Sequence, residues 1–151
     1  MQMLNLPKAE LTVRQEEGCQ KVFDVLRRRY VTLTPEEWVR QHFVHFLIHH
    51  KHYPASVIGN EVSINLFGTK KRCDSVVYDA SARPIMIIEY KAPDVEITQR
   101  VFEQIGRYNV RLRVRWLIVS NGLQHYCCRV DYEANRFVYL PDIPDWETLQ
   151  G

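Results

Sequence analysis

The sequence predicts an α/β protein in which two long helices pack on a mixed β-sheet. Residues 34–50 and 98–112 carry apolar side chains at the spacing of amphipathic helices. Three runs rich in valine and isoleucine lie between these helices, at residues 55–66, 72–78 and 84–91, and are typical of strands. The order of helix, three strands and helix, followed by further strands, predicts an α/β sandwich.

The first 33 residues carry the weakest pattern. Residues 11–15 and 19–23 flank Gly18, which predicts a β-hairpin with the glycine at its turn. The apolar residues between Val22 and Leu26 also fit one face of a short helix, and this alternative stays open. We expect the segment to cover one edge of the domain.

The helix over residues 34–50 has a clear start. Thr34 suits the N-cap, Pro35 the first turn, and Glu37 the position whose side chain reaches back in a capping box. The helix should end near His50, because the residue before a proline disfavours helical conformation and Pro54 follows closely.

The strand at residues 84–91 is a continuous apolar run, so we expect it to be central and buried on both faces. Residues 115–120 form a second strand of this buried type, and residues 121–122 (Asn-Gly) are a hairpin-type turn. Two further strands are expected at residues 124–130 and 136–140.

A chain of 151 residues is short enough for one domain. We predict an N-terminal extension over residues 1–33, a core domain over residues 34–140 and a C-terminal tail over residues 141–151. The net charge of +2 at pH 7 is too small to indicate nucleic-acid binding by itself.

The sequence predicts neither a membrane span nor structural disulfides. No apolar run is long enough to cross a bilayer, and the N-terminus lacks a signal-peptide pattern, so no membrane partner is expected. The four cysteines lack metal-ligand spacing, and the neighbours Cys127 and Cys128 would face opposite sides of a strand. Free, mostly buried thiols in a cytoplasmic protein are predicted.

Charged groups interrupt two of the apolar strands at Asp74, Glu89 and Lys91. Side chains alternate along a strand, so Glu89 and Lys91 share a face. Unpaired charge beside an apolar core is costly, and either an ion pair at the strand end or a bound metal would relieve it. Mg²⁺ prefers oxygen ligands, which Asp74, Glu89 and the carbonyl of Tyr90 would supply. Lys91 would then hold or activate the attacking water in phosphodiester hydrolysis.

Asp74, a gap of fourteen residues and Glu89-x-Lys91 resemble the PD-(D/E)xK nuclease signature. Gln104 and Tyr108 lie four residues apart on one helix face, a spacing similar to that of RecB-like and type I restriction nucleases. The short sequences KRCD, IIEYKAP and VSNG around the motif most resemble those of the N-terminal nuclease domain of type I restriction enzyme R subunits, in a small stand-alone form. The resemblance covers about residues 34–140, and a cysteine replaces the proline before the aspartate.

The resemblance implies a restriction-endonuclease-like α-β-β-β-α-β core with an additional C-terminal hairpin. It also implies an endonuclease that hydrolyses DNA with Mg²⁺ or Mn²⁺, in restriction or DNA processing. Asp74 and Glu89 would hold the metal, Lys91 would act on the water, and Gln104 and Tyr108 would position the phosphate or the metal's waters.

Nucleases of this kind usually place a glutamate of the first helix near the metal. Glu37 is the candidate for a metal ligand here, with Glu36 as the substitute, although a capping box explains Glu37 equally well. Basic residues around the motif are candidates for phosphate contacts. They are Lys70, Lys71, Arg107 and Arg111.

Two other functions stay open: a non-catalytic nucleic-acid-binding module, and a subunit active only with a helicase, translocase or methyltransferase partner. A full R subunit also carries a helicase motor, for which this chain has no room, so we expect no ATP-driven restriction by the chain alone. His45 and His49 have the spacing to share a zinc ion, but no acid or cysteine of obvious spacing completes the set. A polar helix flank is the preferred interpretation of these histidines.

Overall fold

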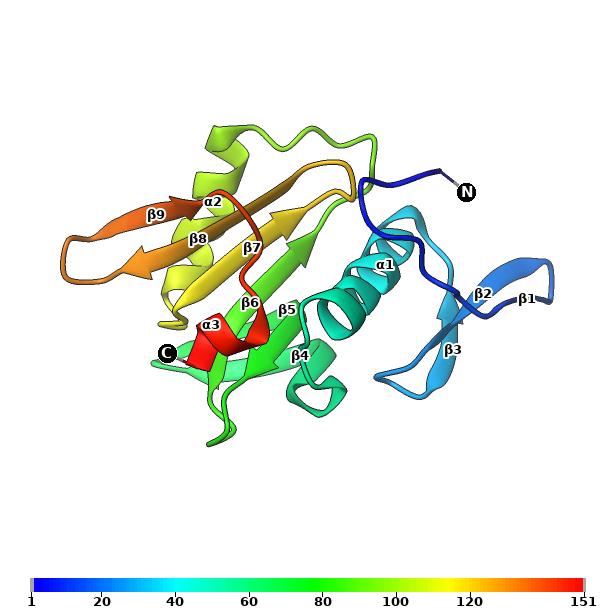
Figure 1. The fold of residues 1–151 in the computed structure, drawn as a ribbon, viewed down its shortest axis with the longest axis horizontal. Helices are drawn as coiled ribbons and strands as arrows, with labels where there is room; N and C mark the ends of the chain where they lie inside the picture. The colour runs from blue at the N-terminus through cyan, green and yellow to red at the C-terminus, as the bar shows by residue number, and fades with distance from the viewer. Residues whose placement is uncertain (1, 151) are drawn as a thin grey trace.

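The computed structural model describes residues 2–150 and is built around a six-stranded mixed sheet. Helix α1 (Pro35–His50) covers one face of this sheet and α2 (Gln99–Val110) the other (Figure 1). Neighbouring strands are antiparallel except for β6 and β7, which are parallel. In sheet order the strands are β4 (Ile58–Leu66), β5 (Thr69–Tyr78), β6 (Pro84–Tyr90), β7 (Trp116–Ser120), β8 (His125–Asp131) and β9 (Arg136–Leu140). The predicted α/β class and restriction-endonuclease-like core are confirmed.

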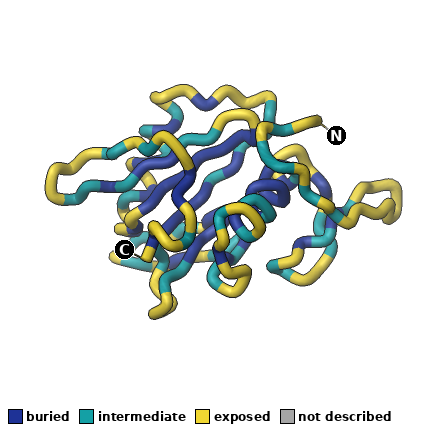
Figure 2. The backbone as a smooth tube through the Cα atoms, in the orientation of Figure 1, coloured by how far each residue is buried: buried dark blue, intermediate teal, exposed yellow. Residues whose placement is uncertain are grey.

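Strand β6 lies in the interior of the sheet and is buried on both faces, as predicted (Figure 2). Met86 and Ile88 pack in the cluster that includes Phe43 of α1. Ile87 faces the other way, into the cluster that includes Phe102 of α2. Strict alternation along β6 therefore gives the domain two cores, one under each helix.

Alternation breaks in β5 next to Asp74. Cys73 and Val76 both join the cluster on the α2 side, although they are an odd number of residues apart. The break lies where β4 carries Glu61 in the left-handed region, with φ of 54°. Pairing with β6 covers only the second half of β5, from Ser75 onward, so the first half is bonded to β4 alone. The register of β4 and β5 is the same on both sides of this point, so the break is a local irregularity at Glu61 and Asp74 and not an inserted residue.

Helix α1 begins and ends as predicted, but its capping box is incomplete. The Oγ1 of Thr34 accepts a hydrogen bond from the backbone N of Glu37 at 3.0 Å, which confirms the N-cap. The backbone N of Thr34 donates instead to the carbonyl of Thr32, at 3.1 Å. The prediction that the Glu37 side chain accepts a hydrogen bond from the backbone N of Thr34 is therefore wrong. The Glu37 carboxylate instead has the ion-pair partners described below.

The N-terminal segment forms a three-stranded antiparallel sheet beside α1 (Figure 1). Its strands are β1 (Val13–Glu16), β2 (Cys19–Asp24) and β3 (Arg29–Thr32). Glu17 and Gly18 turn between β1 and β2 with positive φ angles of 51° and 79°, as a two-residue hairpin requires. No helix forms between Val22 and Leu26, and the third strand was not expected from the sequence.

The C-terminal residues pack on the core rather than trailing from it. A short loop connects β9 to helix α3 (Trp146–Gln150). Ile143 of this loop and Leu149 of α3 join the core under α1. The hydroxyl of Tyr53 donates to the carbonyl of Pro144 at 2.8 Å, and the Tyr53 ring lies 5.6 Å from that of Trp146. The sequence did not predict a helix in this C-terminal segment.

All four cysteines are free thiols, and three of them are buried, as predicted. Cys127 packs under α1 and Cys128 under α2, which confirms that the neighbours face opposite sides. Among residues 2–150, no helix has the length and apolar character needed to span a membrane.

Candidate active site

Asp74 and Glu89 come together where β5 and β6 part. Ser75 pairs with Ile88, and one step further along the same antiparallel register lie Asp74 and Glu89. The Oδ2 of Asp74 accepts a hydrogen bond from the backbone N of Tyr90 at 2.9 Å, which ties this side chain to the end of β6. The structure thus juxtaposes the two acids that the sequence analysis assigned to a metal.

The Glu89 carboxyl is an unusual acid. Burial and the neighbouring charge of Asp74 raise its pKa to about 7, although the ammonium of Lys71 acts in the opposite direction. Its side chain is only 14% exposed. Two acids in one partly buried place resist ionising together, and an added cation relieves that repulsion.

Lys71, not Lys91, is the lysine that contacts Glu89. The Nζ of Lys71 donates to the Glu89 carboxylate and, at 2.7 Å, to the Oδ1 of Asn109 on α2. Strict alternation would turn Lys71 away from the face of Asp74, and the break beside Asp74 reverses that. Lys71 had been expected only as a phosphate contact.

Lys91 follows the last residue of β6 and is partly buried. Its backbone N donates to the carbonyl of Ser120 at 2.9 Å, which continues the pairing of β6 with β7. Within residues 2–150 its ammonium has no ion-pair partner.

Glu37 is not part of this pair of acids. Its carboxylate accepts a hydrogen bond from Arg27 at 2.8 Å and from Gln41 at 3.1 Å. The Nε of Arg40 lies 3.0 Å from the oxygen that Gln41 contacts, without hydrogen-bond geometry. The guanidinium groups of Arg27 and Arg40 therefore satisfy the Glu37 carboxylate, which was expected to bind the metal. Glu37 is part of α1, which covers the opposite face of the sheet from α2. Glu36, the substitute, is exposed in the first turn of α1.

The Q-x-x-x-Y pair lies on the exposed side of α2. Gln104 is exposed, and Tyr108 is 45% exposed. The Tyr108 ring centre lies 5.0 Å from the Nζ of Lys71 and 5.7 Å from the Arg111 guanidinium. Tyr108 is thus one contact away from Glu89, through Lys71.

The other basic candidates divide between two places. Lys70 is exposed near the tip of the β4–β5 hairpin. Arg107 lines a cavity of about 470 Å³ together with Tyr132 and Phe137, on the side of α2 that faces the β8–β9 hairpin.

Sequence reasoning missed Asn109 and a buried polar chain behind the site. The Nδ2 of Asn109 has no hydrogen-bond partner among the described residues, although the side chain is buried. On the α1 side, the hydroxyl of Tyr90 donates to Ser75, which donates to Asn60. Asn60 in turn donates to Asp24 of the N-terminal sheet at 2.9 Å. Isolated polar letters in apolar strands were the available signal, but their partners are distant in sequence.

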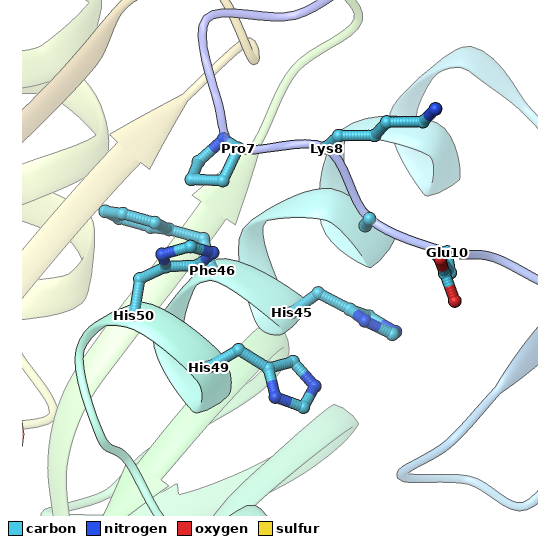
Figure 3. Close-up of a pocket in the computed structure, with 8 residues that line it drawn as sticks. Pro7, Lys8, Glu10, His45, Phe46, His49 and His50 are labelled. Atoms are coloured by element: carbon cyan, nitrogen blue, oxygen red, sulfur yellow. The ribbon is translucent and has the colours of Figure 1, made fainter.

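The histidines of α1 lie elsewhere, in a cavity of about 440 Å³ between the helix and the N-terminal segment. His45 and His49 project from the same flank of α1, with Glu10 across from His45 (Figure 3). The ring centres of the two histidines are 5.6 Å apart. The Nε2 of His45 is buried and has no partner among the described residues. Burial and the neighbouring histidines lower the pKa of His45.

Neither place gathers three ligands. Over residues 2–150 there is no group of three or more histidine, cysteine, aspartate or glutamate side chains placed to hold a metal. Among the described residues, Asp74 and Glu89 are thus two carboxylates without a third, and the metal-binding role of Glu37 stays a prediction. Magnesium keeps several waters and needs only one or two carboxylates, so the pair still suits it.

The fold and this pair define a class: a restriction-endonuclease-like α/β domain with two acids where the central antiparallel strands separate. A family model described as type I restriction enzyme R protein N terminus (HSDR_N) matches residues 35–144. Because the match covers more than two thirds of the chain, the chain belongs to this family, as the resemblance implied. A comparison with curated proteins found no match.

Proposed function

We propose that this chain is a metal-dependent nuclease domain that hydrolyses DNA phosphodiester bonds in a restriction system or in DNA processing. The observation that carries the proposal is the juxtaposition of Asp74 and Glu89, with the pKa of Glu89 raised to about 7. Perturbed acids in a polar site are typical of functional groups. Membership of the restriction-enzyme family supports the same conclusion.

The residues present fit a hard divalent cation. Asp74, Glu89 and the carbonyl of Tyr90 offer oxygen ligands, and the Lys71 ammonium already satisfies one of them, so the place accepts positive charge. Magnesium or manganese bound here would neutralise a phosphate and lower the pKa of a water. A cation at this position would compete with Lys71 for Glu89.

Lys91 is the group proposed to orient the attacking water. It follows Glu89 by two residues, and its ammonium has no ion-pair partner among residues 2–150. Gln104 and Tyr108 offer an amide and a hydroxyl on the exposed face of α2, where they would position the phosphate. The water's oxygen bonds to phosphorus as the bond to the leaving oxygen breaks, the water's proton passes to solvent, and the leaving oxygen takes up a proton from solvent.

Nicking of supercoiled plasmid tests this proposal. The parent chain should nick DNA with Mg²⁺ or Mn²⁺ and lose that activity in EDTA. Asp74→Ala and Lys91→Ala should abolish nicking while keeping the parent's circular dichroism spectrum. Asp94→Ala is the matched control, because Asp94 is an exposed acid in the loop after Lys91. If Asp74→Ala and Lys91→Ala cut as well as the parent, the site is wrong.

One observation favours a second candidate, a non-catalytic nucleic-acid-binding module. The ion pair between Lys71 and Glu89 satisfies the buried acid without any metal. DNA binding without cleavage under every divalent cation tested would support this second function against the first.

A further inference from the structure

Exposed aromatic and basic side chains gather where the tip of the β4–β5 hairpin lies beside the loop after α2 (Figure 1). We call these residues the basic–aromatic surface. They are Phe67, Tyr108, Arg111 and Arg113. The Arg113 guanidinium lies 5.9 Å from the Phe67 ring centre, and that of Arg111 lies 5.7 Å from the Tyr108 ring centre.

Phe67 is the least expected member of this surface. It is 70% exposed, although phenylalanine usually buries its ring. Its φ of 51° lies in the left-handed region, which is costly for a bulky residue. The two-residue turn formed with Gly68 requires this positive φ, as at Glu17, so the turn fixes the ring at the tip of the hairpin. A ring held out in solvent at the tip of a hairpin suggests a stacking platform for a flat ligand.

The positive charge of the surface is not neutralised internally. Among the described residues, no carboxylate lies within ion-pair distance of Arg111 or Arg113. Nearby Arg83 differs, because its Nε lies 3.3 Å from Asp79. Cations free of protein partners beside exposed rings match a ligand that carries both phosphates and flat bases.

The surface is also continuous with the candidate active site. The Nζ of Lys71 contacts Glu89 and lies 5.0 Å from the Tyr108 ring centre. On the other side, Phe67 and Arg113 help to line a cavity of about 440 Å³ with Leu112. Cavities of this size accept small ligands, so one base would find room there.

We propose that the basic–aromatic surface binds single-stranded nucleic acid, with bases stacked on Phe67 and Tyr108 and phosphates held by Arg111 and Arg113. The stacking faces of bases are hidden inside a duplex, whereas they are open in a single strand. The proposal rests on the proposed function, since it names the strand that would be presented to Asp74 and Glu89. An unpaired strand running from Phe67 past Tyr108 would reach Lys71, which contacts Glu89.

Fluorescence polarisation in EDTA tests the surface without any cleavage. The probes are a fluorescent oligo(dT) and a blunt duplex of equal length, bound by the full chain over a range of salt concentrations. The parent should bind the single strand more tightly. Phe67→Ala should weaken that binding by about fivefold or more, because one stacked base contributes ~1–3 kcal/mol. Arg113→Ala should reduce the salt slope by about 0.7, the value for one phosphate contact on a single strand.

Two controls separate the surface from general effects. Met3→Ala removes an apolar side chain that is 89% exposed, and Arg29→Ala removes an exposed arginine of β3 in the N-terminal sheet. Met3→Ala should leave oligo(dT) binding unchanged, and Arg29→Ala should leave the salt slope unchanged. Equal affinity for duplex and single strand, or equal loss in Phe67→Ala and Met3→Ala, would overturn the proposal.

The same samples distinguish failure of the surface from failure of the nuclease. Phe67-dependent binding without cleavage in Mg²⁺ or Mn²⁺ would refute the nuclease and leave the surface standing. Cleavage of single strands with the same KM in the parent and in Phe67→Ala would refute the surface alone.

Discussion

Replacing Arg40 by methionine should strongly destabilise the fold, because Arg40 is a buried cation with three partners. Its side chain is 8% exposed and lies 3.0 Å from Glu37 and 2.7 Å from Glu61. It also donates to the carbonyl of Asp74 at 2.8 Å. Removing one member of a buried ion pair costs about 3–5 kcal/mol, since the remaining charges stay buried.

Arg72→Met is the matched control, because Arg72 pairs with the same Glu61. The Nε of Arg72 lies 2.8 Å from Glu61, but the Arg72 side chain is 68% exposed. Exposed pairs contribute about 0–1 kcal/mol, so this variant should unfold close to the parent. For a chain of this size each kcal/mol shifts Tm by about 2–4 °C. Arg40→Met should therefore lower Tm by roughly 6–20 °C, and Arg72→Met by at most about 4 °C.

Thermal and urea unfolding followed by circular dichroism measure both variants against the parent. Equal losses in Arg40→Met and Arg72→Met would refute the reasoning that burial makes the Arg40 network structural. That result would also reopen a metal-binding role for Glu37, whose charge the network is taken to satisfy.

Three further outcomes are expected. Lys71→Met should raise the pKa of Glu89 above about 7 and Asp74→Asn should lower it, because the two charges act on Glu89 in opposite directions. NMR titration of the Glu89 carboxyl measures both pKa shifts, and shifts of the same sign would contradict this prediction. Burial raises the pKa of Asp24, but hydrogen bonds from Arg27 and Asn60 outweigh burial and hold the pKa below its ordinary value. The contribution of Asp24 to stability is therefore present above about pH 4 and lost as the pH falls. The urea midpoint of Asp24→Asn should fall less steeply with acid than that of the parent, and parallel pH profiles of the two midpoints would argue against this prediction. Leu149→Ala should reduce the free energy of unfolding by about 2–5 kcal/mol, because Leu149 is buried under α1, and an unchanged urea midpoint would show that α3 is dispensable.

Local pattern sufficed for the elements that pack by regular periodicity. The unbroken apolar run of β6 predicted its interior position, and Thr34 marked the start of α1. Alternation along β6 also predicted that Glu89 and Tyr90 point to opposite faces of the sheet. In the structure, Tyr90 lies in the core under α1. These features depend on neighbours within a few residues, which a sequence displays directly.

The missed features depend on contacts between distant residues. Lys71 reaches Glu89 only because alternation breaks beside Asp74, a break that no letter in the strand announces. Glu37 fits a capping box by spacing, yet Arg27, ten residues earlier, takes its carboxylate. Leu149, like Ile143 and Trp146, is an isolated apolar residue in residues 141–151, and only the approach of the chain end to α1 gives it a core to join.

The central claim is that Asp74 and Glu89 hold a divalent metal for phosphodiester hydrolysis. A crystal soaked with Mn²⁺ and measured for anomalous scattering tests it most directly. The account predicts an anomalous peak between the two carboxylates, with the Lys71 ammonium displaced from Glu89. A parent protein that nicks DNA in Mn²⁺, but whose soaked crystal shows no peak there and keeps Lys71 on Glu89, would contradict it.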